Sequence, residues 1–509
     1  MRNRERTIAV SASNERLEPR RWWALGVVSL ATFMTYLDNN IVNVAIPTIQ
    51  RSLHLSVSGL EWVVSSYLLT LAGLLLVGGR LADVYGRRRL FLVGLAVFTL
   101  SSLTAGLAGS GGVLIASRAI QGVGGALLMP ATLAIIMAAF TNVRERNTAV
   151  GIWAAVSALA LALGPVLGGL ISQHLHWGWI FLINVPVGVV TFALAVFYIR
   201  ESRADSAVRR LDLPGLAASA LSLFALTYAL IEGNVSGWTA PLILGAFALA
   251  AVAAAAFGVV ESRAAHPMVD LSMFRSREFS GGNGTFMIWA FGILGIYFFT
   301  SLYLQQILGF SPVEAGLAFV PMALTIVVFA GIAPRVEARA GAHRTVAAGM
   351  LLMVVGLILF AHLGEHAGYA SLLPGFMLFG AGAGLMNVPL TNAVMAAIPP
   401  GRTGIASALL NASREVAGLL GITVIGAVLR TRQSASLRAG ADPVHAFVDG
   451  YHTGLWVTIV MLAGGVLISY LTLRPHAAAA ATEPSAALAG LATVDALAAE
   501  LITADEVAR

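Results

Sequence analysis

Long apolar stretches separated by short polar segments run along almost the whole chain. A helix needs roughly 20 apolar residues to cross about 30 Å of hydrocarbon, and fourteen stretches reach that length. We place their centres near Met34, Leu69, Thr99, Gly125, Leu159, Val190, Phe224, Leu249, Ala290, Thr325, Gly356, Gly384, Glu415 and Leu462. The first stretch follows an Arg-rich segment and is too long for a cleaved signal sequence, so we count it as a span. The pattern predicts an all-α polytopic membrane protein.

The composition agrees with this class and excludes several kinds of chemistry. The chain is 58% hydrophobic and 11% charged, with a mean hydropathy of +0.83, whereas soluble proteins carry about 25% charged residues. It contains no cysteine, which excludes disulfides, thiolate metal sites and cysteine nucleophiles. The net charge is +6. We do not expect nucleic acid as a partner, because the arginines gather in short segments between apolar stretches, where they act as topology signals.

The arginine distribution predicts the orientation of the chain. With the amino terminus inside, the inner segments receive Arg2, Arg4, Arg6, Arg16, Arg20, Arg21, Arg87, Arg88, Arg89, Arg144, Arg146, Arg203, Arg209, Arg210, Arg275, Arg277, Arg335, Arg339 and Arg402. The outer loops receive Arg51, Arg430, Arg432 and Arg438. This bias predicts that both termini are cytoplasmic. The hairpin after the thirteenth span departs locally from the rule.

The spans divide into groups of six, two and six. We expect an amino-terminal tail at 1–21, a six-helix bundle at 22–200, a linker with two extra transmembrane helices at 201–279, a second six-helix bundle at 280–474 and a cytoplasmic Ala-rich tail at 475–509. A faint repeat supports the division, because Gly-bounded, Arg-rich segments at 78–90 and 331–346 follow the second span of each bundle. Such repeats are typical of transporters whose halves rock around a central site. The last tail is either disordered or a surface helix.

Residues 154–169, AAVSALALALGPVLGG, combine apolar character with a cluster of small residues that ends at Gly169. Ala160, Gly164 and Gly168 recur every fourth residue and therefore fall on one face of a helix. Such a face lets another helix backbone approach closely in a membrane, and Pro165 removes a backbone donor and softens the helix. On spacing alone, ordinary tight packing and a functional element explain this cluster equally well.

Further segments resemble motifs of one family. They are LDNNIVNVAIP at 37–47, GRLADVYGRRRL at 79–90, LIASRAIQGVGGA at 114–126, WGWIFLINVPVG at 177–188 and YLQQILGFSPVEAGLAFVP at 303–321. Together with the small-residue cluster, they resemble the major facilitator superfamily and, within it, the drug:proton antiporter family with fourteen transmembrane helices. The chain departs from the family pattern at Ala160, where glycine is usual, at Gly178, where arginine is common, and at Glu415, where glutamine is frequent.

The resemblance implies a major facilitator fold, with two extra helices between two six-helix bundles, and export by alternating access. It implies a bacterial cytoplasmic membrane, lipophilic drugs, antibiotics or dyes as substrates, and protons as the exchanged ion. Its antiporter motif is carried by Gly164, Pro165, Gly168 and Gly169, and its gating loop by Gly79, Asp83, Gly86, Arg87 and Arg88.

The resemblance further implies a latch at the gating loop. In the outward-open state Asp83 would meet the inner start of the thirteenth span, near Arg402, Thr403 and Gly404. A helix amino terminus and a nearby arginine both attract an anion, so the contact is physically sound. The arginines of this loop can equally serve only to fix topology, and both roles are compatible.

Charged residues inside a span cost at least about 2.5 kcal/mol, so they usually face the bundle interior and have a partner. The deepest are Asp38, Arg118, Arg414 and Glu415. At about 1.5 Å per residue, Asp38 is about 22 Å up its helix from the inner surface and Arg118 about 9 Å from the outer one, so the two lie at nearly the same level. We expect them to pair. Our hypothesis is that Asp38 carries the proton and Arg118 tunes its protonation; the alternative is a static pair that fixes packing.

Arg414 and Glu415 lie about 16 Å into the thirteenth span. Adjacent helix positions point about 100° apart, so we do not expect these two side chains to pair with each other. Glu415 is then either a second proton or cation site or a carboxylate paired to another helix.

Aromatic, soft and amide side chains near the expected centre are candidates for a substrate cavity. They are Met34, Asn43, Trp62, Tyr67, Gln121, Trp153, Trp289 and Asn387. Each is individually as well explained by packing. An acid among aromatic rings suits lipophilic cations, so we expect a multidrug exporter; a dedicated exporter of one endogenous metabolite, antibiotic or lipid is the alternative.

We also weighed a membrane-embedded enzyme and a solute importer. The sequence has no metal-ligand cluster, nucleophile elbow or phosphate-binding Walker loop, so we expect no enzyme activity, no metal, no cofactor and no use of ATP. An importer is not expected to carry the antiporter motif. The expected partners are a small-molecule substrate, protons and membrane lipid, with the chain acting as a monomer.

Overall fold

The computed structural model of the protein describes residues 18–140, 142–203, 212–264, 269, 271–365, 367–398 and 403–474. Every regular element within these ranges is a helix, so the predicted all-α class is confirmed. The Ala-rich tail at 475–509 and most of the tail at 1–21 lie outside the described residues.

The helices follow the order of the apolar stretches. The first part of the chain forms α2 (Glu18–Leu53), α3 (Val57–Tyr85), α4 (Arg87–Gly106), α5 (Gly111–Ala139), α6 (Val143–His174), α7 (Trp179–Leu182) and α8 (Asn184–Tyr198). The middle forms α9 (Leu213–Ser236), α10 (Pro241–Arg263) and the short η1 (Leu271–Arg275). The last part forms α11 (Arg277–Leu302), η2 (Tyr303–Ile307), α12 (Pro312–Ala318), α13 (Val320–Ala340), α14 (Ala342–Phe360), α15 (Tyr369–Ala396), α16 (Thr403–Arg438) and α17 (Pro443–Thr472).

Twelve helical segments of the described chain are long and apolar enough to cross a membrane. Three of them join consecutive elements, namely α7 with α8, α11 with η2, and α12 with α13. Helices α2 and α6 are not among the twelve, although their 36 and 32 residues exceed the length that a span requires. Helix α2 carries Asp38, Asn39, Asn40 and Asn43 near its middle, which lowers its hydropathy. The count of fourteen spans therefore stays a prediction.

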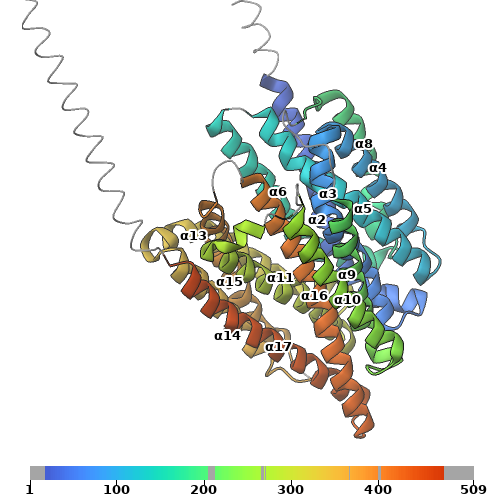
Figure 1. Cartoon of the computed structure of the whole chain (residues 1–509). Coiled ribbons are helices and arrows are strands. Elements are labelled where there is room, and N and C mark those ends of the chain that lie inside the picture. Colours follow the sequence, from blue (N-terminus) through green and yellow to red (C-terminus); the bar gives the residue numbers. More distant parts are fainter. Residues whose placement is uncertain are drawn as a thin grey trace, which may run out of the picture.

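The helices pack as two halves with a helix pair beside them. We call the side on which α2 begins the inner side and the opposite side the outer side, following the orientation predicted from the arginines. In the first half α5 packs along α3 and α4, and α2 along α6; in the second half α15 packs along α13 and α14, and α16 against α11 and α17. Figure 1 shows α9 and α10 beside these halves, and α9 contacts α3 of one half and α16 of the other. The predicted domain boundaries stay predictions.

The repeated Arg-rich segments prove to be joints of one residue rather than loops. Helix α3 continues to Tyr85 and α4 begins at Arg87, so the loop that we expected at 79–90 is reduced to Gly86. In the second half Gly341 alone joins α13 to α14. Both glycines have positive φ, 118° and 80°, a conformation that glycine adopts at little cost. The same joint in both halves gives the sequence repeat its structural basis.

The two halves meet at their outer ends. Nε2 of Gln305 donates to the backbone oxygen of Val44 at 2.9 Å, and Nε2 of Gln306 donates to Oε1 of Gln50 at 2.7 Å. Both donors lie in η2, a π-helical turn, a feature that often marks functional positions in helices. These contacts join α2 of the first half to the end of the α11–η2 span of the second.

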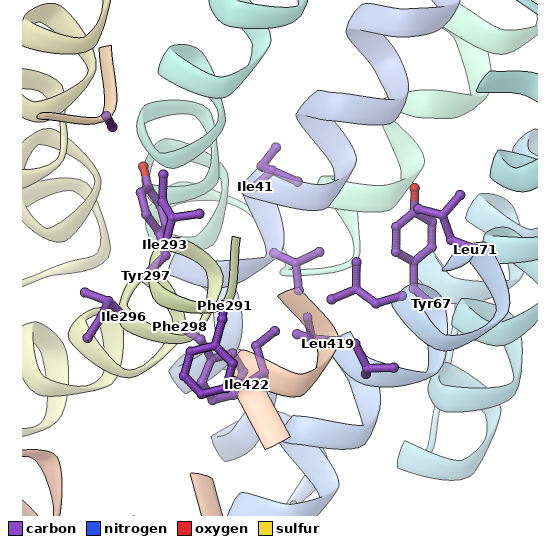
Figure 2. Close-up of a cluster of buried hydrophobic side chains, with 14 of the residues drawn as sticks. Ile41, Tyr67, Leu71, Phe291, Ile293, Ile296, Tyr297, Phe298, Leu419 and Ile422 are labelled. Atoms are coloured by element: carbon purple, nitrogen blue, oxygen red, sulfur yellow. The ribbon is translucent and has the colours of Figure 1, made fainter. Parts of the chain in front are cut away.

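A continuous apolar cluster joins the halves deeper in the protein. Figure 2 shows buried side chains of α2 and α3 facing those of α11, with α16 between them. They include Ile41, Tyr67, Leu71, Phe291, Ile293, Ile296, Tyr297, Phe298, Leu419 and Ile422. Together with the glutamine contacts, this cluster makes the structure one that is closed on its outer side.

Candidate transport site

Asp38 lies in the middle of α2, and its side chain is completely enclosed. Its Oδ2 contacts Nη1 of Arg118 at 2.5 Å. Its Oδ1 accepts hydrogen bonds from Nε2 of Gln121 at 2.8 Å and from Nδ2 of Asn184 at 2.7 Å. Three donors thus point at the two carboxylate oxygens, an arrangement that suits the ionised form of the acid.

The expected ion pair between Asp38 and Arg118 is present, and the surroundings of Arg118 hold it firmly. The guanidinium lies over the ring of Tyr67, 4.2 Å from the centroid, and 5.5 Å from the ring centroid of Phe181, so cation–π attraction adds to the ion pair. Its Nη1 also donates to Oε1 of Gln121 at 2.7 Å. Its Nη2 is buried without a hydrogen-bond partner. One donor of the arginine is therefore left over in this state.

A serine of α4 completes this group. Oγ of Ser102 accepts from Nε2 of Gln121 at 2.8 Å and from Nδ2 of Asn184 at 3.5 Å. We call Asp38, Arg118, Gln121, Asn184 and Ser102 the Asp38 cluster. Its members come from α2, α4, α5 and α8, so the packing of the whole first half sets its geometry. Because the carboxylate is enclosed, proton exchange requires a change in this packing.

The prediction that Arg414 and Glu415 do not pair is wrong. Nη2 of Arg414 donates to Oε1 of Glu415 at 3.0 Å and to the hydroxyl of Tyr36 at 3.1 Å. The Cα directions of neighbouring residues do diverge, but the long arginine side chain bends back far enough to reach the next residue. The pair also contacts α2 of the other half through Tyr36, two positions before Asp38.

Tyr67 connects the two charged groups. It carries the guanidinium of Arg118 on its ring, and it lies within electrostatic reach of both Asp38 and Glu415. A movement of α16 relative to α3 therefore changes the surroundings of both carboxylates.

The other predicted cavity residues are not brought together. Gln121 belongs to the Asp38 cluster, and Met34 and Tyr67 are buried in the apolar core. Nε1 of Trp62 donates to Oε1 of Glu232 at 2.8 Å, so this ring faces α9 rather than the interior. The ring also packs against two aromatic side chains of α9, Phe224 and Tyr228.

The remaining cavity candidates have local partners. Trp153 donates to Thr32 at 2.8 Å, and Trp289 lies edge-on to Phe286. Asn43 donates to the backbone of Asn39 at 3.5 Å, and Asn387 accepts through its backbone from Thr391 at 2.8 Å. The indole Nε1 of Trp289 is buried and has no hydrogen-bond partner among the described residues.

The small-residue cluster of α6 serves two interfaces. A Cβ at Gly164 would collide with Asn40, and one at Gly168 with the backbone oxygen of Ile41, so this face lies against α2 in the same half. A Cβ at Gly169 would collide with the backbone oxygen of Pro312 in α12 of the other half. The small-residue cluster therefore does pack tightly, and at Gly169 it packs against the other half.

The α12 side of this contact is equally close. A Cβ at Gly316 would collide with the backbone oxygen of Pro165, and Oε1 of Gln173 accepts from the backbone nitrogen of Val313 at 3.2 Å. Ala160 is buried, as the packing face requires.

The gating loop makes contacts within its own half. Nη2 of Arg87 donates to Oδ1 of Asp83 at 3.0 Å, and Nη2 of Arg88 donates to the backbone oxygen of Val196 at 2.6 Å. Glu201 accepts from the backbone nitrogens of Arg88 and Arg89, which lie in the first turn of α4. A Cβ on Gly79 would lie in ordinary contact with Pro130 of α5. The expected latch partner Arg402 lies outside the described residues, and so does the side chain of Thr403. Thr403 and Gly404 form the described start of α16.

Asn184 and Ser102 of the Asp38 cluster were not predicted from the sequence. Asn184 stands in the quoted segment at 177–188, and an amide inside so apolar a stretch was a usable signal; Ser102 offered none. The assignment of Arg430 and Arg432 to an outer loop is also wrong, because α16 continues to Arg438. Both arginines are paired instead, Arg430 with Glu61 at 2.5 Å and Arg432 with Asp449 at 2.9 Å. Pairing explains why these arginines depart from the orientation rule.

Comparisons with known proteins agree with this architecture. The Multidrug resistance protein Stp of Mycobacterium tuberculosis is 37% identical over 426 residues, which cover 82% of this chain and 79% of that protein. The Puromycin resistance protein pur8 of Streptomyces alboniger is 36% identical over 463 residues, 90% of this chain and 92% of that protein. A crystal structure of an auto-inhibited POT family peptide transporter is similar in fold, with a TM-score of 0.66 at 15% identity over 90% of this chain and 97% of that one. The model of the Major Facilitator Superfamily matches residues 28–422, and the chain therefore belongs to the Major Facilitator Superfamily.

Proposed function

We propose that the protein exports lipophilic drugs, antibiotics or dyes, cations among them, in exchange for protons by alternating access. The observation that carries the proposal is the enclosed Asp38, held by Arg118, Gln121 and Asn184 in a transporter that is closed on its outer side. The names of two relatives, a multidrug resistance protein and a puromycin resistance protein, support export of drugs.

Asp38 is the proton carrier in this proposal. The three donors around it stabilise the ionised carboxylate in the outer-closed state, so the proton has left on the inner side. Opening of the outer side shifts α5 against α2 and weakens the contact with Arg118, after which the carboxylate takes up a proton. Return to the outer-closed state restores the donors and expels that proton to the inside. The free Nη2 of Arg118 gives the arginine another direction in which to bond while the pair is apart.

Glu415 and Tyr36 sense the substrate in this proposal. Glu415 is nearly buried beside Arg414, whose side chain is 23% exposed, and the pair lies where the two halves meet. A lipophilic cation that displaces Arg414 from Glu415 gains the carboxylate and the aromatic rings nearby. This movement reaches α2 through the hydrogen bond from Arg414 to Tyr36.

A dedicated exporter of one endogenous product is the second candidate. It is favoured by the name of the relative from Streptomyces alboniger, a resistance protein for one antibiotic, puromycin. The two candidates differ in substrate breadth and share the proton mechanism.

The proposal also covers the membrane location, the oligomeric state and the energy source of the protein. The chain acts as a monomer in the bacterial cytoplasmic membrane with both termini inside, contacts lipid, uses neither ATP nor a cofactor or metal, and draws its energy from the proton gradient. The gating-loop residue Asp83 belongs to the outward-open latch, which is released in the outer-closed state.

The test is proton-driven uptake of a fluorescent cationic dye into inverted membrane vesicles that contain the full chain. Vesicles with the wild-type chain should accumulate dye and lose it when a protonophore is added. Vesicles with Asp38→Asn should lose nearly all uptake. Asp449→Asn is the matched control, because this carboxylate also pairs with an arginine, Arg432, but lies outside the Asp38 cluster. It should behave as the wild type.

Full proton-driven uptake by Asp38→Asn would overturn the assignment of the carrier. If the wild type accumulates no dye, a panel of single antibiotics and neutral or anionic metabolites should be tested for substrate-induced proton release. Response to one compound only would select the dedicated exporter, and response to none would overturn the proposed export.

A further inference from the structure

A second buried ion pair joins the two halves near their outer ends. Oε1 of Glu61 in α3 contacts Nη1 of Arg430 in α16 at 2.5 Å, and the side chains are 0% and 9% exposed. Glu61 stands four residues after the start of α3 at Val57, about 6 Å from the outer end of that helix. The pair is therefore separate from the Asp38 cluster and lies at the outer seam between the halves.

The Glu61 carboxylate is held less completely than that of Asp38. Neither of its oxygens makes a well-directed hydrogen bond, and neither do Nε and Nη1 of Arg430. The backbone of α16 lies directly against it, since a Cβ on Gly426 would collide with the carboxylate. Asp38, by contrast, has three donors. A buried carboxylate with a single charged partner is the more easily neutralised by a proton.

Arg430 has a second set of partners that does not depend on Glu61. Its Nη2 donates to the backbone oxygens of Leu230 and Ile231 in α9, at 3.3 and 3.0 Å. Helix α9 is further tied to α16 by Asn234, whose Nδ2 donates to the backbone oxygen of Ala427 at 2.9 Å. When Glu61 moves away, the guanidinium thus keeps these two backbone acceptors. The Glu61 carboxylate has no other donor among the described residues, so it is left without a partner.

The other charges near Glu61 favour its neutral form. Glu232 of α9 faces it and is itself held by Nε1 of Trp62 at 2.8 Å. Arg118 of α5 points to Asp38 and not to Glu61. Arg430 of α16 is thus the charged neighbour that favours the ionised form of Glu61. A like charge disfavours ionisation, so loss of Arg430 leaves a carboxylate that is both buried and repelled.

We propose that Glu61 is a proton-binding site that controls opening of the outer side. A proton from the outer solution forms an O–H bond on the Glu61 carboxylate, the attraction to Arg430 ends, and α3 separates from α16 while Arg430 stays on the α9 carbonyls. When the O–H bond breaks, the proton returns to the outer solution and the pair closes the seam again. The inference takes from the proposed function only the alternate opening of the two sides.

The test measures the distance between spin labels across the outer ends. The chain has no cysteine, so Gly109→Cys between α4 and α5, with Ala370→Cys at the outer start of α15, gives two unique labelling sites. Both positions are exposed, and a Cβ on Gly109 meets open space. Double electron–electron resonance is recorded without substrate in lipid nanodiscs, at about pH 8 and about pH 5, a range that spans titration of a buried carboxylate. In the otherwise wild-type chain, acidification should raise the ratio of long to short distances about tenfold.

Variants then assign the response to this pair. In Glu61→Gln the long distances should dominate at both pH values, and Arg430→Gln should also favour them. Glu365→Gln is the matched control, because this outer carboxylate pairs with His445 inside the second half; it should keep the wild-type response.

Each opposite result overturns the inference. If the outer distance in the wild type does not change with pH, the inference is overturned, even if Glu61→Gln fails to fold. If Glu61→Gln folds and its pH response equals that of the wild type, the inference is also overturned. Since no substrate is present, failure of the dye-uptake experiment leaves this test unaffected, and failure here leaves drug export by Asp38 standing.

Discussion

Nδ2 of Asn184 donates a hydrogen bond of 2.7 Å to Oδ1 of Asp38, from a position 146 residues later in the chain. This bond makes α8 part of the candidate proton site, although α8 contributes no charge to it. The Asp38 carboxylate thus has a neutral donor that can be removed without leaving an unpaired buried charge. Asn184 is therefore the most informative position for testing how the cluster controls its proton.

Replacing Asn184 by alanine should shift the pH profile of uptake. The hydrogen bond favours the ionised form of Asp38, so its loss lets the acid keep its proton to higher pH on the inner side. A hydrogen bond to a charged group contributes about 1.5–3 kcal/mol, and about 1.4 kcal/mol corresponds to one pH unit. The profile of dye uptake against the pH of the inner side should therefore move up by about one to two units.

Thr191→Val is the control for this shift. Thr191 lies on α8 as well, but its hydroxyl donates to the backbone oxygen of Val187 within the same helix. Its profile should match that of the wild type. A profile of Asn184→Ala that keeps its position and only loses height would contradict the role assigned to the hydrogen bond.

Arg118→Gln should destabilise the protein strongly, and Asp38→Asn should rescue it. Removing one member of a buried ion pair leaves an uncompensated charge and costs about 3–5 kcal/mol. The loss should be smaller at acid pH, because protonation of Asp38 removes the unpaired charge. Thermal inactivation in detergent measures both effects, for each single variant and for the double variant.

The double variant also separates a static pair from a proton carrier. If the pair only fixes packing, a stable double variant should transport with full proton coupling. We expect it to be stable and to lack coupling, which vesicle uptake with and without protonophore will reveal.

Gly169→Ala should impair outer closure and leave the first half intact. Its new Cβ would meet the backbone of Pro312, which cannot move aside as a side chain can. Helices α6 and α12 must then separate, at a cost of about 1–3 kcal/mol typical of overpacking, and uptake should fall about tenfold. Gly151→Ala on the same helix meets open space and should have normal uptake. Equal activities of the two variants would remove Gly169 from the gate.

Much of the fold and part of the site follow from the sequence. The lengths of the apolar stretches predicted the helices, and arithmetic along two of them brought Asp38 and Arg118 to one level. Depth is readable in this way because the rise per residue of a helix is fixed. The rotation of each helix about its axis is not fixed in the same way. For this reason Asn184 and Ser102 could not be predicted as members of the Asp38 cluster.

Two errors have the same physical origin, the reach of arginine. The angle between neighbouring Cα positions suggested that Arg414 and Glu415 stay apart, but the side chain is long enough to fold back. Arg430 was assigned to an outer loop because a charge usually ends a span. In the structure the helix continues, and the charge is matched by Glu61 of another helix, a pairing that requires knowledge of which helices are neighbours.

Glu415→Gln should reduce transport of cations and spare that of neutral drugs. The neutral amide keeps the shape of the side chain and can still accept from Arg414, so the fold and the contact with Tyr36 should survive.

The lost charge removes the attraction for a cationic substrate, which we expect to lower its apparent affinity about tenfold, or about 1.4 kcal/mol. Competition of cationic and neutral compounds for dye uptake measures this difference. Glu337→Gln, whose carboxylate contacts Asn392 near the inner end of the second half, should leave both classes unchanged. If Glu415→Gln has the wild-type substrate range and pH profile, the Arg414–Glu415 pair only positions α16, and the cation preference must arise elsewhere.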